Sequence, residues 1–260
     1  MPYIDTHAHL DDEQFDADRH EVIARCRQAG VEVILSVGIT ADSSEAAVRL
    51  AESDKTIYAA VGIQPNYCAE AAPDDWDRIV ALASHPRVIA VGETGLDRHW
   101  DFTPLEVQQD YFDRHLRLAA RHDLPFIVHC REAEAEVATM LREAAGRGSM
   151  RGVMHAFSSD QPLAAECLAM GLYVSFAGAV TYKNKKFNPL REVAAGVPDD
   201  RILVETDSPY LVPHPLRGKQ KRNEPANIVH TARCLADLRG CYPETFAAQT
   251  TANARRLFGL

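Results

Sequence analysis

The stretch Tyr3-Ile-Asp-Thr-His-Ala-His-Leu10 begins as an apolar run and reaches two histidines one residue apart. Side chains two residues apart in a β-strand point to the same face, about 6.6 Å apart along the chain. His7 and His9 can therefore share one metal ion, at about 2 Å from each ring nitrogen. Two acidic residues follow Leu10 and predict that the strand ends there, so the histidine pair lies at the mouth of a strand.

Seven further apolar runs of strand length follow, most of them before a segment with helical periodicity. Continuous rather than alternating runs indicate a parallel sheet that is buried on both faces. We therefore predict an α/β fold, a (β/α)8 TIM-type barrel that occupies residues 1–260 as a single domain. A doubly wound open sheet is the alternative, although no Gly-x-Gly-x-x-Gly follows the first strand to favour dinucleotide binding. The expected strands are 3–10, 31–36, 57–61, 88–91, 125–128, 152–154, 172–176 and 201–204, and the expected helices are 16–29, 41–53, 74–83, 104–122, 132–146, 161–170, 188–195, 225–239 and 245–258.

The composition is that of a soluble globular protein, with 46% hydrophobic and 25% charged residues. No apolar run approaches the roughly 18 residues of a membrane span, and the N-terminus lacks the basic and apolar segments of a secretory signal. The six cysteines are scattered without a Cys-x-x-Cys pair, which is typical of reduced thiols. We expect a cytoplasmic protein with no membrane contact and no obligate protein partner.

The charge is unevenly distributed. A net charge of −9 argues against a protein that coats nucleic acid generally. Residues 208–222 nevertheless contain no acidic side chain, and five of the six lysines lie in two short stretches. A local cationic rim on an acidic body suits a substrate that carries phosphate, whereas a pair of solvated loops is the alternative explanation. The five lysines are Lys183, Lys185, Lys186, Lys219 and Lys221.

Four later strands also end in residue types that bind metals, and the active sites of (β/α)8 barrels lie at the carboxyl ends of the strands. Each such residue alone could cap a helix, bond within the core or open a turn. Their occurrence at matching strand ends favours one shared site. The predicted donors are His7, His9, Glu93, His129, His155 and Asp207.

Six donors exceed what one tetrahedral ion needs, and they suit two ions about 3.5–4 Å apart. Imidazole and carboxylate donors admit zinc, manganese or iron, and magnesium less readily because it prefers oxygen. The chain is therefore expected to bind one or two divalent metal ions. In the expected arrangement His7, His9 and Asp207 hold the first ion, His129 and His155 hold the second, and Glu93 bridges the two.

Further segments carry a family pattern: Asp5-Thr-His-Ala-His-Leu10, Gly92-Glu-Thr-Gly-Leu-Asp97, Pro125-Phe-Ile-Val-His-Cys-Arg131, His155-Ala-Phe-Ser158, Glu205-Thr-Asp-Ser-Pro-Tyr-Leu211, Asn223-Glu-Pro225 and Asn253-Ala-Arg-Arg-Leu-Phe258. Together they resemble the signatures of the TatD family of metal-dependent deoxyribonucleases in the amidohydrolase superfamily. The resemblance spans essentially the whole chain. It implies a barrel, a one- or two-metal site on the donors named above, and hydrolysis of phosphodiester bonds in DNA.

The expected activity is that of a 3′-5′ exonuclease-like deoxyribonuclease acting on single strands or DNA ends. Asp207 is the candidate base that takes a proton from a metal-activated water, and Glu93 is the second catalytic carboxylate. Tyr182, Phe187 and Tyr210 could stack on bases, with core packing as the alternative. The expected substrate-binding residues are Gln64, Arg131, Lys183, Lys185, Arg217 and Lys219.

Two features depart from the family pattern. Gln64 stands where the family usually has a histidine, so a neutral amide that cannot serve as an acid replaces a protonatable group. The cationic loop at 218–222 is also longer than the usual run before Asn-Glu-Pro. Both departures concern substrate preference and leave the metal donors intact.

Two other functions are compatible with the same donors. One is a metal-dependent ester or amide hydrolase, such as a D-aminoacyl-tRNA deacylase, whose substrate also carries phosphates. The other is a protein that binds metal without catalysis. Turnover of DNA, RNA, aminoacyl-tRNA and simple esters distinguishes these functions.

Overall fold

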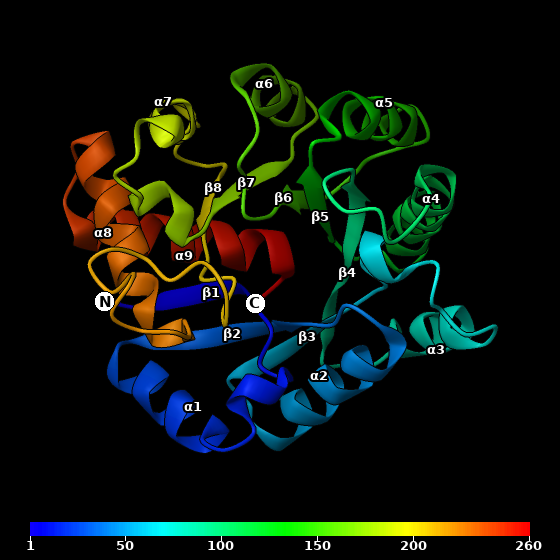
Figure 1. The fold of residues 1–260 in the computed structure, drawn as a ribbon, viewed down its shortest axis with the longest axis horizontal. Helices are drawn as coiled ribbons and strands as arrows, with labels where there is room; N and C mark the ends of the chain where they lie inside the picture. Colours follow the sequence, from blue (N-terminus) through cyan, green and yellow to red (C-terminus); the bar gives the residue numbers. More distant parts are fainter.

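The computed structural model describes residues 1–260 and contains one sheet of eight parallel strands in sequential order (Figure 1). Each strand pairs with the next one along the chain. This order confirms the predicted (β/α)8 barrel and excludes the doubly wound sheet, whose strand order reverses. The strands are β1 (Tyr3–Ala8), β2 (Val31–Val37), β3 (Ile57–Val61), β4 (Val88–Asp97), β5 (Phe126–Arg131), β6 (Gly152–Met154), β7 (Tyr173–Phe176) and β8 (Ile202–Val204).

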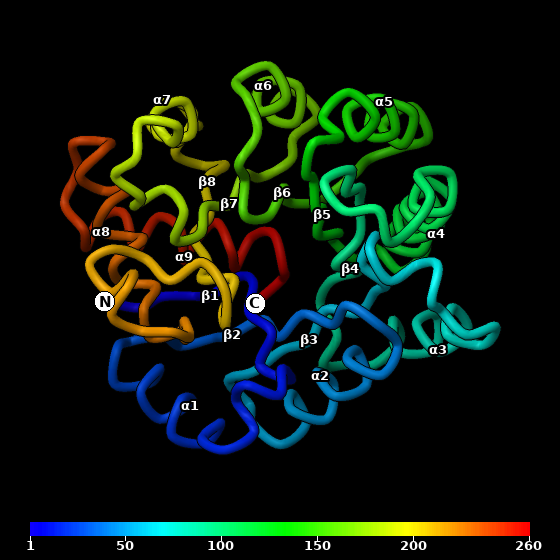
Figure 2. The backbone as a smooth tube through the Cα atoms, viewed as in Figure 1, coloured from blue at the N-terminus to red at the C-terminus, as the bar shows by residue number.

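Helices surround the sheet, and the backbone colours run round the ring from blue to orange, while the red C-terminal helix crosses toward the centre (Figure 2). Helix α1 begins later than predicted because residues 16–18 form a turn, which follows a 3-10 turn at Glu13–Phe15 that is capped by Asp12. Helix α8 begins later because Pro225–Asn227 forms another such turn. The six cysteines are free thiols in the structure, and no helix has the length and apolar character needed to cross a bilayer. The helices are α1 (Arg19–Gln28), α2 (Ala41–Ser53), α3 (Asp75–Leu82), α4 (Leu105–His122), α5 (Glu134–Ala145), α6 (Gln161–Ala169), α7 (Asn188–Gly196), α8 (Ile228–Arg239) and α9 (Pro243–Phe258).

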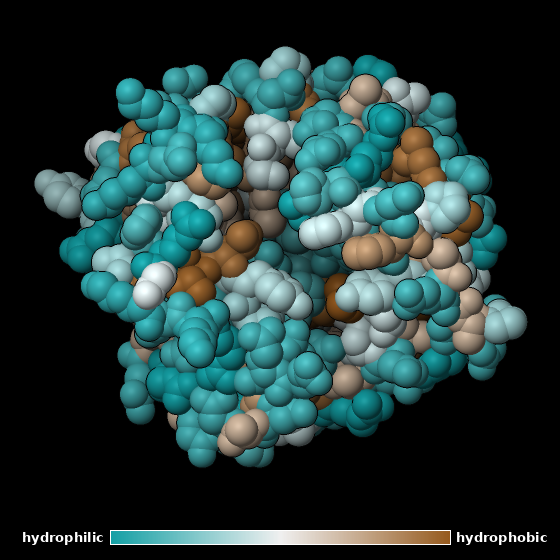
Figure 3. All heavy atoms as spheres, in the orientation of Figure 1, coloured by the Kyte–Doolittle hydropathy of each residue, from teal (hydrophilic) through white to brown (hydrophobic).

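Apolar side chains form two layers. The larger layer lies between the sheet and the helices and contains 55 buried residues. The smaller layer joins residues of all eight strands to Leu257 and Phe258 of α9. The side chain of Thr251 in α9 donates to the carbonyl oxygen of Pro2, just before β1, so this helix closes the amino end of the barrel. In the view of Figure 1, the space-filling surface is hollowed near the centre of the ring, where hydrophilic side chains predominate (Figure 3).

Strand β4 runs farther than predicted. The sequence predicted an end at Val91, whereas the strand continues through Gly92–Asp97 and pairs with β5. A register shift falls just after Val91, in the segment that holds Glu93, and such irregularities redirect side chains. Gly95 permits the close approach of the two strands, because a Cβ atom there would lie 2.0 Å from the carbonyl oxygen of His129.

The first and last strands are joined by both main-chain and side-chain hydrogen bonds. An isolated bridge, between Ala8 and Ser208, links their ends through two main-chain bonds. The fully buried carboxyl group of Asp5 adds two bonds to Thr206, whose backbone N–H lies 2.9 Å from Oδ1 and whose hydroxyl lies 2.5 Å from Oδ2. Burial raises the pKa of Asp5 to about 8, so this carboxyl group is mostly neutral at pH 7. A neutral acid therefore closes the barrel beside the histidine pair.

We expect Asp5→Ala to lower the free energy of unfolding by about 1–3 kcal/mol, because the buried backbone N–H of Thr206 would lose its acceptor. Asp5→Asn retains an oxygen for the Thr206 backbone and should cost less. Denaturant unfolding of the metal-free protein measures both variants. Equal losses would contradict a closure that depends on these hydrogen bonds.

Candidate metal centre

The six predicted metal donors lie together at the carboxyl ends of the strands. Strand β1 and the residue after it supply two histidines, β4 supplies Glu93, and β5 supplies His129. The last two donors directly follow β6 and lie just beyond β8. In each of three overlapping groups the possible ligand atoms all lie within 4.8 Å of one another. These groups are His7, His155 and Asp207; His7, His9 and Glu93; and Glu93, His129 and His155.

Glu93 lies between two pairs of imidazoles and turns one carboxylate oxygen toward each pair. Its Oε1 lies 2.9 Å from Nδ1 of His129 and 3.0 Å from Nε2 of His155. Its Oε2 lies 3.5 Å from Nε2 of His7 and 3.9 Å from Nε2 of His9. A carboxylate with one oxygen facing each pair of imidazoles has the geometry of a ligand that two cations can share.

Asp207 joins the pair of histidines from the first strand. Its Oδ1 lies 3.4 Å from Nε2 of His9 and 3.8 Å from Nε2 of His7, and these two nitrogens lie 3.3 Å from each other. The backbone of Asp207 has a left-handed φ of 54°, and its N–H donates to the carbonyl oxygen of His7 at 2.9 Å. The main chain therefore holds these three donors together.

Buried charges of opposite sign balance in the cluster. Burial favours the neutral form of Glu93, but charge and hydrogen bonds from His155 and His129 hold its pKa well below the usual value. Burial also opposes ionisation of Asp207, yet the bond to His9 and the nearby imidazoles lower its pKa. Burial alone would lower the pKa of His9, but Asp207 raises it to about 9. A divalent cation can replace such protons as the balancing charge, so the donor set fits a metal.

Two buried acidic side chains behind the donors were not predicted. Oδ2 of Asp97 lies 2.9 Å from Nε2 of His129, and Oε1 of Glu205 lies 3.5 Å from Nδ1 of His155. Carboxylates in this position orient metal-binding imidazoles and fix their tautomers. Strand alternation does not identify either acid, because a register shift follows Val91 and Asp207 has a left-handed φ of 54°.

The predicted substrate-binding residues lie at the end of β5 and on segments that follow β3, β7 and β8. Arg131 is exposed and forms no ion pair. Gln64 is buried, and its amide oxygen accepts from the backbone of Asn66 at 2.9 Å, which leaves its NH2 group without a partner in the chain. The loops after β7 and β8 pack together where the N–H of His214 donates to Thr181. Their predicted cations, all exposed and without an ion pair, are Lys183, Lys185, Arg217 and Lys219.

The three aromatic residues near these loops differ in exposure. Tyr182 is buried, with the guanidinium of Arg217 3.7 Å from its ring centroid. Phe187 packs edge-on against Tyr182 at 5.1 Å. Tyr210 is 50% exposed. Packing therefore accounts for Tyr182 and Phe187, and only Tyr210 offers a free ring.

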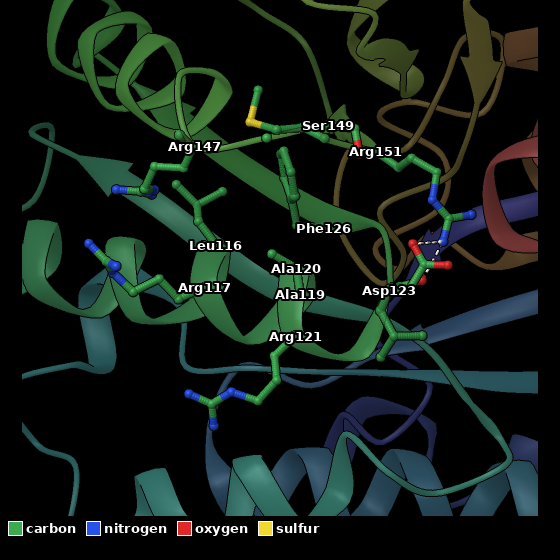
Figure 4. Close-up of a pocket in the computed structure, with 14 residues that line it drawn as sticks. Leu116, Arg117, Ala119, Ala120, Arg121, Asp123, Phe126, Arg147, Ser149 and Arg151 are labelled. Carbon is green, nitrogen blue, oxygen red and sulfur yellow. Dashed lines mark hydrogen bonds and ion pairs between the residues drawn. The ribbon is translucent and has the colours of Figure 1, made fainter.

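A separate cavity of about 590 Å³ lies between α4 and the loop before β6 (Figure 4). Its lining includes Leu116, Phe126 and four arginines, and Arg151 forms an ion pair with Asp123 at 3.1 Å. Phe126 begins β5, so the cavity lies near the amino end of that strand, and none of the three donor groups contributes to its lining. This cavity is therefore separate from the six-donor cluster.

A family model described as TatD related DNase matches residues 4–259. The chain belongs to this TatD family. The Bacillus subtilis (strain 168) protein named uncharacterized metal-dependent hydrolase YabD is 42% identical over 254 residues, 98% of each chain. The Citrobacter rodentium protein named 3′-5′ ssDNA/RNA exonuclease TatD is 36% identical over 258 residues, 98% of this chain and 97% of the relative. The crystal structure of the TatD homolog YjjV from Escherichia coli K12 has a TM-score of 0.92 at 30% identity and covers 99% of this chain and 98% of its own.

These matches confirm the predicted family and enzyme class: the chain is a TatD-family metal-dependent hydrolase. The family match at residues 4–259 spans the barrel, including the segments that carry the six predicted donors.

We expect Asp97→Ala to weaken metal binding about 10- to 100-fold, because His129 would lose the carboxylate that orients its ring. Competition with a chelator of known affinity measures the change. Asp101→Ala is the matched control, since Asp101 is an exposed acid on the following loop that forms no ion pair. Equal affinities for both variants would show that Asp97 does not support the metal centre.

Proposed function

We propose that this TatD-family hydrolase is a deoxyribonuclease that removes nucleotides from the 3′ ends of single-stranded DNA. The position of the Glu93 carboxylate is the main support for this proposal, because one of its oxygens faces each of two groups of imidazoles. Two cations about 3.5–4 Å apart, one beside each oxygen, would suit displacement at a phosphorus atom. The printed name of the Citrobacter rodentium relative, a 3′-5′ ssDNA/RNA exonuclease, supports the choice of substrate.

The proposal assigns two divalent metal ions to the cluster, zinc or manganese in preference to magnesium, because imidazoles contribute most of the donors. When bound, such ions lower the pKa of a water molecule toward neutrality and polarise a phosphoryl oxygen. In this assignment His7, His9 and Asp207 would hold one ion, His129 and His155 would hold the other, and Glu93 would contribute to both.

Asp207 is the proposed base. Its lowered pKa keeps the carboxylate ionised at neutral pH and able to accept the proton of the attacking water. Its side chain is 14% exposed, against 5% for Glu93, so water and substrate reach Asp207 more easily. Glu93 instead remains enclosed by imidazoles, which suits a positioning role.

The proposed phosphate contacts come from exposed cations around the cluster. A guanidinium or ammonium group without an internal ion pair is free to neutralise a DNA phosphate. Gln64 has a free amide NH2 that can donate to a phosphate oxygen. Arg131 is two residues beyond His129 on the same strand, which suits the phosphate at the cleavage point. The loop cations in this proposal are Lys183, Lys185, Arg217 and Lys219.

We also propose that residues 1–260 act as one metal-dependent hydrolase domain. Helix α9 supports this, because its side chains belong to the same inner layer as residues of all eight strands. Removal of the helix would expose that layer.

Nucleotide release from labelled DNA tests the proposal. With added manganese, we expect the wild-type protein to release nucleotides from single strands and a chelator to abolish the release. Asp207→Asn should lower the rate on the order of 10²- to 10⁴-fold, because an amide cannot take the proton. Asp237→Asn, an exposed change on α8, is the control.

Two results would contradict the nuclease. Cleavage of D-aminoacyl-tRNA without any release from DNA would identify an ester hydrolase. Unchanged turnover of DNA, RNA, aminoacyl-tRNA and simple esters by the Asp207→Asn variant would leave only a metal-binding role for the cluster.

A further inference from the structure

Exposed aromatic side chains gather at the carboxyl end of the barrel. The structure has six exposed large hydrophobic side chains, and four of them lie on segments that follow β3, β4 and β8. The other two, Met1 and Tyr242, lie before β1 and between α8 and α9. The four at the carboxyl end are Tyr67, Trp100, Phe102 and Tyr210.

Trp100 and Phe102 pack on each other instead of entering the core. Their ring planes differ by 10° with centroids 5.5 Å apart, and the side chains are 46% and 60% exposed. Neither residue belongs to the apolar layers of the barrel. The ring of His99 meets Trp100 edge-on at 4.7 Å, and the guanidinium of Arg131 lies 5.6 Å from the Trp100 ring. The result is an exposed aromatic pair with a cation over the Trp100 ring.

The loop that carries these rings is fixed to the metal centre. Oδ1 of Asp97 accepts from the backbone N–H groups of His99 at 2.9 Å and Trp100 at 3.3 Å, while Oδ2 of the same carboxylate contacts His129. The buried amide of Gln108 donates to the carbonyl oxygens of Asp97 and Thr103, which begin and end the loop. The aromatic pair is thus held one carboxylate away from a predicted metal ligand.

We propose that Trp100 and Phe102 form a stacking platform for an unpaired base of single-stranded nucleic acid, with Arg131 contacting a neighbouring phosphate. Every base has a π-face that stacks on aromatic side chains without regard to sequence. A base inside a duplex already stacks on its neighbours, so the platform selects single strands. The inference rests on the proposed nuclease function and names the part of the substrate that this loop holds.

A second copy of the chain is the competing occupant. Two aromatic side chains bury about 150–250 Å² each, whereas a stable interface needs roughly 800 Å² from each partner. The guanidinium over the Trp100 ring belongs to Arg131, which has no acidic partner in the chain. Both observations favour a small anionic ligand with an aromatic face over self-association.

Fluorescence tests the binding directly. The chain has two tryptophans, and Trp76 packs against the core beside His115. In the Trp76→Phe variant, Trp100 is the only indole. We expect a short phosphorothioate-linked oligothymidine to quench its emission in the metal-loaded protein and the matching duplex to quench it far less. Unchanged emission with the single strand at saturation would overturn the proposal.

A pair of substrates separates stacking from a general loss of activity. The double variant Trp100→Ala/Phe102→Ala should lose about tenfold or more in kcat/KM on single-stranded oligothymidine. On a strand of the same length with abasic residues it should match the wild type, because no base is present to stack. Tyr242→Ala, which removes a ring that is 79% exposed away from the platform, should leave both substrates unaffected.

The outcomes distinguish the platform from the nuclease itself. If the wild type releases nucleotides and the double variant releases them from oligothymidine at the same rate, the stacking proposal is wrong and the nuclease proposal is unaffected. If the wild type releases none, the nuclease is wrong, and the quenching measurement still decides whether Trp100 holds a base. Sedimentation tests self-association. If the wild type sediments as a dimer and the double variant as a monomer, the surface is a dimer interface and the proposal is overturned.

Discussion

A single carboxylate, that of Glu93, holds the two halves of the candidate site together. Four imidazoles from three strands face its two oxygens. Without the negative charge of Glu93, these buried imidazoles would lose the carboxylate that stabilises their positive charge. Burial by itself would neutralise Glu93. The imidazoles prevent this, so the carboxylate and its neighbours stabilise each other's charges. Metal binding is the natural use of such a balance, because a divalent cation can take the place of the protons.

The backbone around Glu93 is arranged to keep that carboxylate in place. The register shift after Val91 turns the Glu93 segment, and Gly95 lets β4 approach the carbonyl oxygen of His129. On the other side of the ring, Asp5 and Thr206 join β1 to β8. The same elements that close the barrel therefore set the distances between donors. Helix α9 closes the amino end with apolar side chains, which leaves the carboxyl end for polar chemistry.

The order of elements and the six donors could be predicted from the sequence, because both follow from local patterns. Apolar runs mark buried strands, and a histidine such as His129 at the end of such a run stands out. Features that depend on contacts between distant segments could not be predicted. Asp97 reads locally as a turn residue, and its bond to His129 is visible only when β4 is seen to continue beside β5. Trp100 and Phe102 are likewise unremarkable in sequence until their loop is placed beside the donors.

The central claim is that side chains from separate strands coordinate two cations, one beside each oxygen of Glu93. Anomalous diffraction from crystals loaded with manganese tests it most directly. The account predicts two manganese peaks about 3.5–4 Å apart, one beside each oxygen of Glu93. Absence of manganese at Glu93, with the imidazoles of His7 and His129 turned toward separate places, would contradict it.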